Sequence, residues 1–175
     1  MSTQTAPDAS QPAELISHLL DRYHAVHRVQ LPELQRLARK VESVHADHPE
    51  VPRGLAEHLA QMESELLSHM EKEEQVLFPL MIKGGHPMIR HPIAMMRHEH
   101  DDHASALAEL ERLSHGMVPP AGACNSWRSL YQGLAQLRDD LQQHIRLENE
   151  LLFPAFEPAS QAAGGCGGGH CGCGG

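Results

Sequence analysis

The sequence predicts an all-α protein, an antiparallel up-down-up-down four-helix bundle with disordered termini. Three observations support this prediction. Apolar residues and His recur at steps of three or four in four separate stretches, which is the spacing of one helix face. Pro and Gly gather in the short segments between these stretches, so neighbouring helices are expected to be antiparallel. Strand patterns are nearly absent.

The first helical stretch follows a polar lead, residues 1–11, which we expect to be disordered. Pro12 suits the first turn of a helix. The stretch runs from Ile16 to Val41, and Pro32 inside it is expected to kink the helix. The other stretches run from Leu59 to Val76, from Ile93 to Leu110 and from Leu130 to Leu152. Together they predict one domain over residues 12–157.

Residues 158–175 are rich in Gly and cannot supply a core, so we expect a flexible tail. The tail holds Cys166, His170, Cys171 and Cys173. Thiolates with an imidazole favour zinc, Cu(I) or a transient iron. A metal-carrying tail and a low-complexity terminus without a role both remain open.

Composition excludes several classes of protein. The formal net charge of -9 argues against nucleic-acid binding, and no apolar run approaches the length of a membrane span. The first ten residues lack the apolar centre of a signal peptide. Four Cys without an export signal indicate a reducing, cytoplasmic location. The unusual count is 15 His, for which metal binding is one explanation.

The chain repeats itself. The segment from His69 to Pro79 reappears about 75 residues later as the segment from His144 to Pro154. Each copy sets a His and a Glu four residues apart, on one helix face, and ends in Leu-Phe-Pro. The segment from His24 to Leu34 likewise matches that from His100 to Leu110. The repeat predicts two similar helical hairpins related by a pseudo-twofold axis.

In an antiparallel bundle, these His and Glu residues reach the same level of the core. Unpaired buried carboxylates are strongly disfavoured, so the cluster predicts bound metal. We expect two divalent metal ions, with Glu73 and Glu148 bridging them, two imidazoles on each ion, and an oxo, hydroxo or similar bridge balancing the charge. Four protein ligands per ion leave open positions, and ligation without thiolate suits iron or manganese better than structural zinc. The predicted ligands are His24, His69, Glu73, His100, His144 and Glu148.

Other polar residues near the predicted site are not assigned as ligands. His45 follows His24 by 21 residues, or ~30 Å of helix, which places it at the opposite end of the bundle unless the chain folds back at Pro32. His27 and His103, one turn deeper, are expected to support the ligands or fill the core. Glu65 is expected on the surface, with a place beside an access channel as the alternative. Cys124 has no visible partner.

Six segments carry a resemblance to a known family: Arg22-Tyr23-His24, Gln30 to Leu34, Lys40 to Asp47, His69 to Pro79, Glu99-His100-Asp101 and His144 to Asn149. They resemble the hemerythrin-like di-iron proteins that repair iron–sulfur clusters (the RIC, YtfE or ScdA group), over about residues 13–157. The resemblance implies a non-haem di-iron bundle of the nitrosative and oxidative stress response. Family members commonly carry an N-terminal helical domain with a paired-Cys motif, and only about a dozen residues precede the first helix here.

Three functions remain open. The first is iron–sulfur cluster repair, in which the protein supplies iron to damaged iron–sulfur proteins. The second is binding of nitric oxide or dioxygen by a scavenger or sensor without iron transfer. The third is a di-iron oxidase or peroxidase-like enzyme. We rank them in this order, so an iron donor is expected rather than a classical enzyme. The sequence leaves the client proteins and the oligomeric state open.

Overall fold

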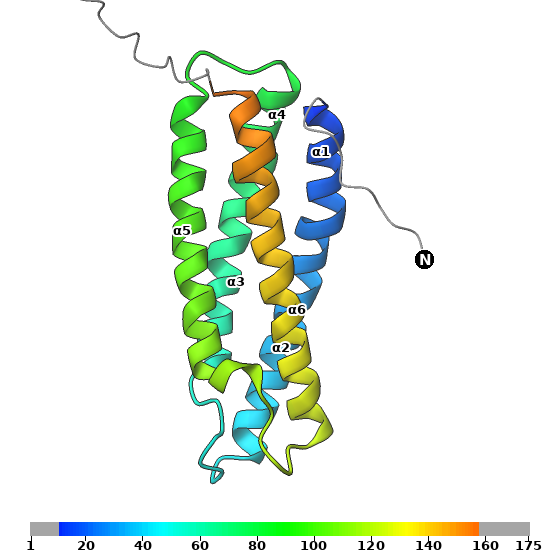
Figure 1. Cartoon of the computed structure of the whole chain (residues 1–175), viewed down its shortest axis with the longest axis vertical. Helices are drawn as coiled ribbons and strands as arrows, with labels where there is room; N and C mark the ends of the chain where they lie inside the picture. Colours follow the sequence, from blue (N-terminus) through cyan, green and yellow to red (C-terminus); the bar gives the residue numbers. More distant parts are fainter. Residues whose placement is uncertain (1–10, 158–175) are drawn as a thin grey trace, which may run out of the picture.

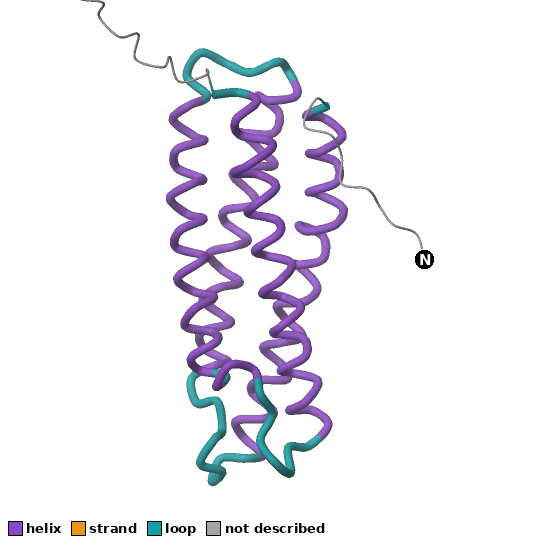
Figure 2. The backbone as a smooth tube through the Cα atoms, viewed as in Figure 1, coloured by secondary structure: helices purple, strands orange, loops and turns teal. Residues whose placement is uncertain are grey.

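The computed structural model describes residues 11–157, which form four long helical stretches packed side by side (Figure 1). Loops lie only at the two ends of the bundle, and no strand occurs in this part of the chain (Figure 2). The predicted all-α bundle is therefore confirmed. The helical elements are α1 (Pro12–Leu19), η1 (Leu20–His24), α2 (Ala25–Val44), α3 (Leu55–Lys72), η2 (Glu73–Leu77), α4 (Phe78–Ile82), α5 (Arg90–Leu113), η3 (His115–Met117), α6 (Asn125–Leu147), η4 (Glu148–Leu152) and η5 (Phe153–Ala155).

Several of these elements join without a break. The first stretch of the bundle consists of α1, η1 and α2, the second of α3, η2 and α4, and the fourth of α6, η4 and η5. The elements η1, η2 and η4 are single π-helical turns, in which backbone hydrogen bonds join residues five apart. The sequence pattern did not predict these turns.

Local chemistry explains where the helices begin and end. Pro12 opens α1, where its missing N–H leaves no helical bond unmade. Gly84 and Gly85 follow α4 with φ angles of 93° and 92°, a conformation that favours glycine. Pro32 does not interrupt its helix, because α2 continues through it from Ala25 to Val44.

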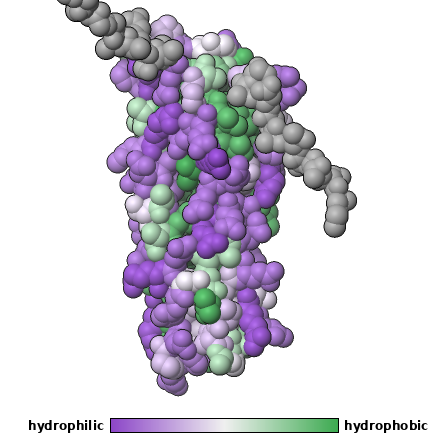
Figure 3. Space-filling model, viewed as in Figure 1, coloured by the Kyte–Doolittle hydropathy of each residue, from purple (hydrophilic) through white to green (hydrophobic). Residues whose placement is uncertain are grey.

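Two separate apolar clusters fill the bundle. We call the larger one the lower core; it includes Leu31, Leu59 and Leu134. The upper core includes Leu15, Leu77 and Phe153. Hydrophilic residues cover much of the outer face in Figure 3, as expected when the apolar stripe of each helix turns inward.

A layer of buried polar residues lies between the two cores. Along α1 and α2, for example, Leu19 belongs to the upper core, His24 and His27 are buried, and Leu31 belongs to the lower core. None of the helices within residues 11–157 combines the length and the apolar character that a membrane span needs. The predicted lead, residues 1–11, and the predicted tail, residues 158–175, lie outside the described part of the chain except for Gln11.

Candidate metal centre

The polar layer brings together the six residues that the sequence singled out. Each has at most 2% of its surface exposed. They form two sets of four residues, in which each residue offers one ring nitrogen or carboxylate oxygen. The four atoms of a set all lie within 4.8 Å of one another. Glu73 and Glu148 belong to both sets. The sets are His24, Glu73, His144 and Glu148, and His69, Glu73, His100 and Glu148.

The two histidines of each set point their Nε2 atoms at one another. The Nε2 atoms of His24 and His144 are 3.2 Å apart, and so are those of His69 and His100. Two nitrogen ligands that each lie ~2.1 Å from one ion can be at most about 4 Å apart. Both pairs therefore meet the distance condition for sharing an ion.

The two carboxylates sit between the histidine pairs. Glu73 Oε2 lies 3.4 Å from His24 Nε2 and 3.5 Å from His69 Nε2. Glu148 lies 3.1 Å from His144 Nε2 through Oε1 and 3.1 Å from His100 Nε2 through Oε2. Each carboxylate thus touches one histidine of each pair, which is the arrangement of a bridging ligand.

Unpartnered oxygens show that the site suits cations. Neither oxygen of Glu73 has a hydrogen-bond partner among residues 11–157, although the residue is fully buried, and Glu148 Oε2 also lacks one. Leaving a carboxylate buried and unpaired is costly, and a coordinated cation removes that cost. The donor set therefore fits two metal ions held by nitrogen and oxygen.

The electrostatics of the layer agree with this fit. Burial, reinforced by the neighbouring Glu148 carboxylate, raises the pKa of Glu73 well above its usual range. Burial also acts to raise the pKa of Glu148, but contacts with His144 and His100 outweigh it and hold that pKa well below its usual range. Two divalent ions would favour the ionised form of both groups.

Two imidazoles of the layer, those of His24 and His69, are neutral at physiological pH. Burial, followed by the proximity of His144, lowers the pKa of His24 to about 4. Burial also lowers the pKa of His69 to about 3. Neutral imidazoles keep a lone pair on Nε2, as metal ligation requires.

The π-helical turns coincide with the site. His24 is the last residue of η1, whereas Glu73 and Glu148 are the first residues of η2 and η4. Turns of this kind occur frequently at functional sites, because the extra residue re-aims side chains within a continuous helix. Here they join helices whose other residues pack the two cores.

Three of the four candidate ligand histidines have a hydrogen-bond acceptor near Nδ1, the ring nitrogen that points away from the other histidine of the pair. The Nδ1 of His24 lies 2.7 Å from Glu74 Oε1, that of His69 lies 2.9 Å from Glu99 Oε2, and that of His100 lies 3.0 Å from Asn149 Oδ1. Such contacts fix the ring and keep the other nitrogen directed at the metal.

Each of these acceptors is itself held by a cation. Arg28 lies 2.9 Å from Glu74, Lys72 lies 2.5 Å from Glu99, and Arg97 lies 3.2 Å from Asn149. The sequence pattern alone predicted no role for Glu74, Glu99 and Asn149. A signal was present, because each is the chain neighbour of a predicted ligand.

His27 and His103 pack against two of the candidate ligands. The ring of His27 stacks on that of His144 with centroids 5.5 Å apart, and His103 packs edge-on against His69 at 5.0 Å. Burial lowers the pKa of His27 to about 3 and that of His103 to about 4. Neither belongs to a four-residue set.

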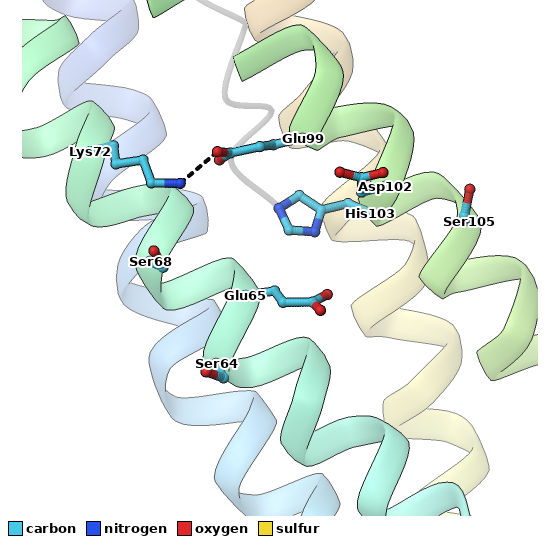
Figure 4. A pocket seen from close by; sticks show the side chains of 8 residues that line it. All are labelled: Ser64, Glu65, Ser68, Lys72, Glu99, Asp102, His103 and Ser105. Carbon is cyan, nitrogen blue, oxygen red and sulfur yellow. Dashed lines mark hydrogen bonds and ion pairs between the residues drawn. The ribbon is translucent and has the colours of Figure 1, made fainter. Parts of the chain in front are cut away.

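A polar pocket of about 590 Å³ lies between α3 and α5, beside the second histidine pair. Figure 4 shows the ring of His103 reaching from α5 toward α3, near the contact between Lys72 and Glu99. Because His103 packs against His69, the pocket ends one side chain from the proposed ligands. Glu65 is exposed, as predicted, and it also lines this pocket, which was the alternative considered.

His45 lies far from the site. It follows the last residue of α2, and its ring packs against Trp127 in the lower core with centroids 4.9 Å apart. Its Nε2 lies 3.1 Å from Cys124 Sγ. The prediction that Cys124 has no partner is therefore wrong, because the loops after α2 and before α6 bring these two side chains together.

A four-helix bundle with two buried His/Glu sets defines a helical metal-binding protein with a di-metal site. The family model of hemerythrin, described as the Hemerythrin HHE cation binding domain, matches residues 15–156. The chain belongs to this family.

Several curated relatives carry the name iron-sulfur cluster repair protein YtfE. The proteins of Citrobacter koseri and Escherichia coli O157:H7 are each 48% identical over 142 residues, and that of Enterobacter sp. (strain 638) is 49% identical over 141 residues. Each match covers 81% of this chain and 64% of the relative. The resemblance seen in the sequence is confirmed, while the chain spans just under two thirds of these relatives' length.

Proposed function

We propose that this protein holds two iron ions and repairs damaged iron–sulfur clusters by supplying iron, acting in the cytoplasm during nitrosative and oxidative stress. The observation that carries the proposal is the pair of buried four-ligand sets sharing Glu73 and Glu148. Identity of 48% to proteins named for cluster repair supports the functional part. Iron–sulfur proteins are then the clients.

In this proposal, His24 and His144 hold one ion, His69 and His100 hold the other, and Glu73 and Glu148 bridge the two. When bound, iron supplies open coordination positions and is also the cargo. The protein's own residues keep the site dry and the imidazoles oriented. Glu74 and Glu99 fix His24 and His69, and the charges of Arg28 and Lys72 balance these two carboxylates.

The absence of thiolate from the two sets also fits a donor. Histidine and carboxylate ligands suit iron, whereas iron–sulfur clusters are held by cysteine thiolates. Transfer from a nitrogen and oxygen site to a sulfur site is therefore chemically reasonable for ferrous iron.

The test is reconstitution of a dehydratase whose iron–sulfur cluster has been damaged by nitric oxide or dioxygen. The iron-loaded protein should restore its activity in the presence of a chelator that captures free ferrous iron. The matched control is Glu73→Leu, which should carry no iron and restore nothing. No recovery with the fully loaded protein would contradict the donor role.

The second candidate is a nitric oxide or dioxygen scavenger or sensor without iron transfer. Four protein ligands per ion leave positions for small ligands, and the pocket beside His103 reaches close to the site. In this case nitric oxide should change the optical spectrum of the loaded protein, all the iron should stay bound, and the damaged dehydratase should remain inactive.

A further inference from the structure

The four ligand histidines are not held equally. His24, His69 and His100 each direct Nδ1 at an oxygen acceptor between 2.7 and 3.0 Å away. The Nδ1 of His144 has no hydrogen-bond partner among the described residues, although only 1% of that residue is exposed. A buried ring nitrogen without a partner is uncommon and calls for a cause.

The internal repeat supplies the cause. His69 and His144 occupy equivalent places in the two hairpins. Around His69, Glu99 precedes the ligand His100 and Lys72 follows His69 by three residues. At the equivalent places around His144, Tyr23 precedes the ligand His24 and Leu147 follows His144 by three residues. The acidic acceptor and its cation are thus replaced by an aromatic and an aliphatic side chain.

The replacement changes what His144 contacts. The ring of Tyr23 stacks on that of His144, with centroids 5.4 Å apart and planes 12° apart. A ring stacked in this way covers the face of the imidazole and offers no acceptor in its plane. Leu147 is buried in the upper core. Its equivalent in the other hairpin, Lys72, is partly exposed and pairs with Glu99. The ring of His144 is therefore held by packing alone on its Nδ1 side, without a hydrogen bond to any of residues 11–157.

An acceptor on the outer nitrogen orients an imidazole and raises its basicity, and losing one typically reduces metal affinity by about 10- to 100-fold. The position formed by His69 and His100 has two such acceptors. The position formed by His24 and His144 has one. The bridging carboxylates do not compensate, because Glu73 and Glu148 contact both positions at closely similar distances.

We propose that the two metal positions differ in affinity, and that the weaker one, formed by His24 and His144, carries the iron available for transfer. This inference rests on the proposed function, since it concerns which of the two ions is delivered. The His69 and His100 position then retains its ion while the other is given up.

The test is an equilibrium titration of the metal-free protein with ferrous iron under anaerobic conditions, in competition with a colorimetric chelator of known affinity. Equilibrium affinities do not depend on the route by which an ion enters. Two binding steps separated by about 10- to 100-fold are expected. Two ions bound with one common affinity would overturn the inference and leave the di-iron site intact. Failure to bind two ions would overturn the proposed site itself.

Matched variants assign the two steps. Glu99→Leu removes the acceptor of His69 and should weaken the tighter step by about 10- to 100-fold, bringing the two affinities close together. Glu74→Leu removes the acceptor of His24 and should weaken the weaker step further while leaving the tighter one unchanged. The opposite assignment, with Glu99→Leu acting on the weaker step, would also overturn the inference.

The control for charge is Glu65→Gln. Glu65 lines the same pocket as Glu99, but within the described part of the chain its carboxylate accepts a hydrogen bond from Gln61 and not from a histidine. Neither step should change in this variant. An equal loss of affinity in Glu65→Gln and Glu99→Leu would show that pocket charge, and not the bond to His69, sets the tighter step. Circular dichroism before each titration checks that the helices are intact.

Discussion

The lower core and the polar layer above it are built on the same four helices, yet they contribute differently. The lower core consists of apolar side chains such as Leu59 and Leu134, both fully buried, and it stabilises the bundle without any ligand. The polar layer buries two carboxylates and several imidazoles, which is unfavourable unless metal is bound. Stability and metal binding are thus assigned to different levels of one bundle.

The largest expected effect is the loss of both ions from a single substitution. Glu73→Leu and Glu148→Leu should each lose both irons, because each carboxylate touches a histidine of both sets. The bundle should still fold, since a similarly sized apolar side chain replaces a buried carboxylate. Metal analysis checks the prediction.

The matched control for these variants is Glu71→Leu, because Glu71 lies on the same helix as Glu73 but is exposed. It should retain two irons per chain. If Glu73→Leu or Glu148→Leu kept a full complement of metal, or the protein carried a single zinc, the bridging assignment would be wrong.

The complementary variant is Leu59→Ala in the lower core. Truncating a fully buried leucine removes packing that does not involve the site, so the free energy of unfolding should fall by about 2–5 kcal/mol. The folded variant should keep two irons. Denaturant unfolding together with metal analysis measures both quantities. Loss of iron from the folded variant would show that the two levels are not independent.

The metal-free protein should become less stable as the pH falls. Burial lowers the pKa of His27 and His69 to about 3 and of His24 and His103 to about 4, against 6.5 for an unburied histidine. The unfolded chain therefore takes up protons below pH 6.5, whereas the folded chain does not until about pH 4. Stability is complete above pH 6.5 and falls by roughly 2 kcal/mol for each such histidine by pH 5.

One carboxyl opposes this trend, since the raised pKa of Glu73 lets the folded state keep a proton that the unfolded state releases. Four histidines outweigh it. Urea unfolding at pH 7 and pH 5 measures the slope, and His27→Phe should reduce the loss by about 2 kcal/mol. Equal stability at both pH values would contradict the burial of neutral imidazoles.

The period of the helices made much of this structure predictable from sequence. Steps of three and four placed His24, His69, His100 and His144 on the core stripes, and the antiparallel order brought them to one level. The spacing can be read within each helix. The antiparallel order needs only the assumption that short loops join neighbouring helices. The internal repeat also predicted two imidazoles for each ion, but not which histidines form each pair.

The remaining features depend on contacts between segments far apart in the chain. Glu99 resembles any exposed acidic residue until the rotation of α5 directs it at His69. The contact between His45 and Cys124 depends on the path of two loops. The π-helical turn at Glu73 adds one residue to a backbone ring without requiring a distinctive residue type. Pro32 lies inside α2, which continues through it.

Iron delivery requires an ion to leave the polar layer while both cores stay folded. We expect the Cys and His residues after residue 158, outside the described part of the chain, to assist delivery. Deleting residues 164–175 should leave folding and the two bundle irons intact but slow transfer to a cluster-free acceptor protein. Transfer at the full-length rate would mean that this segment has no role in delivery.

The smallest expected effect concerns His45, which shares its residue type with the ligands but lies at the other end of the bundle. His45→Ala should keep two irons per chain, since the ring contacts Trp127 and Cys124 and neither four-residue set. His24→Ala is the matched variant, because it removes a histidine from the same helical stretch at the level of the site, and it should reduce the iron content. Metal analysis of the two proteins side by side separates residue type from position. If His45→Ala lost iron and His24→Ala did not, then the level of a histidine along the bundle would not determine whether it binds metal.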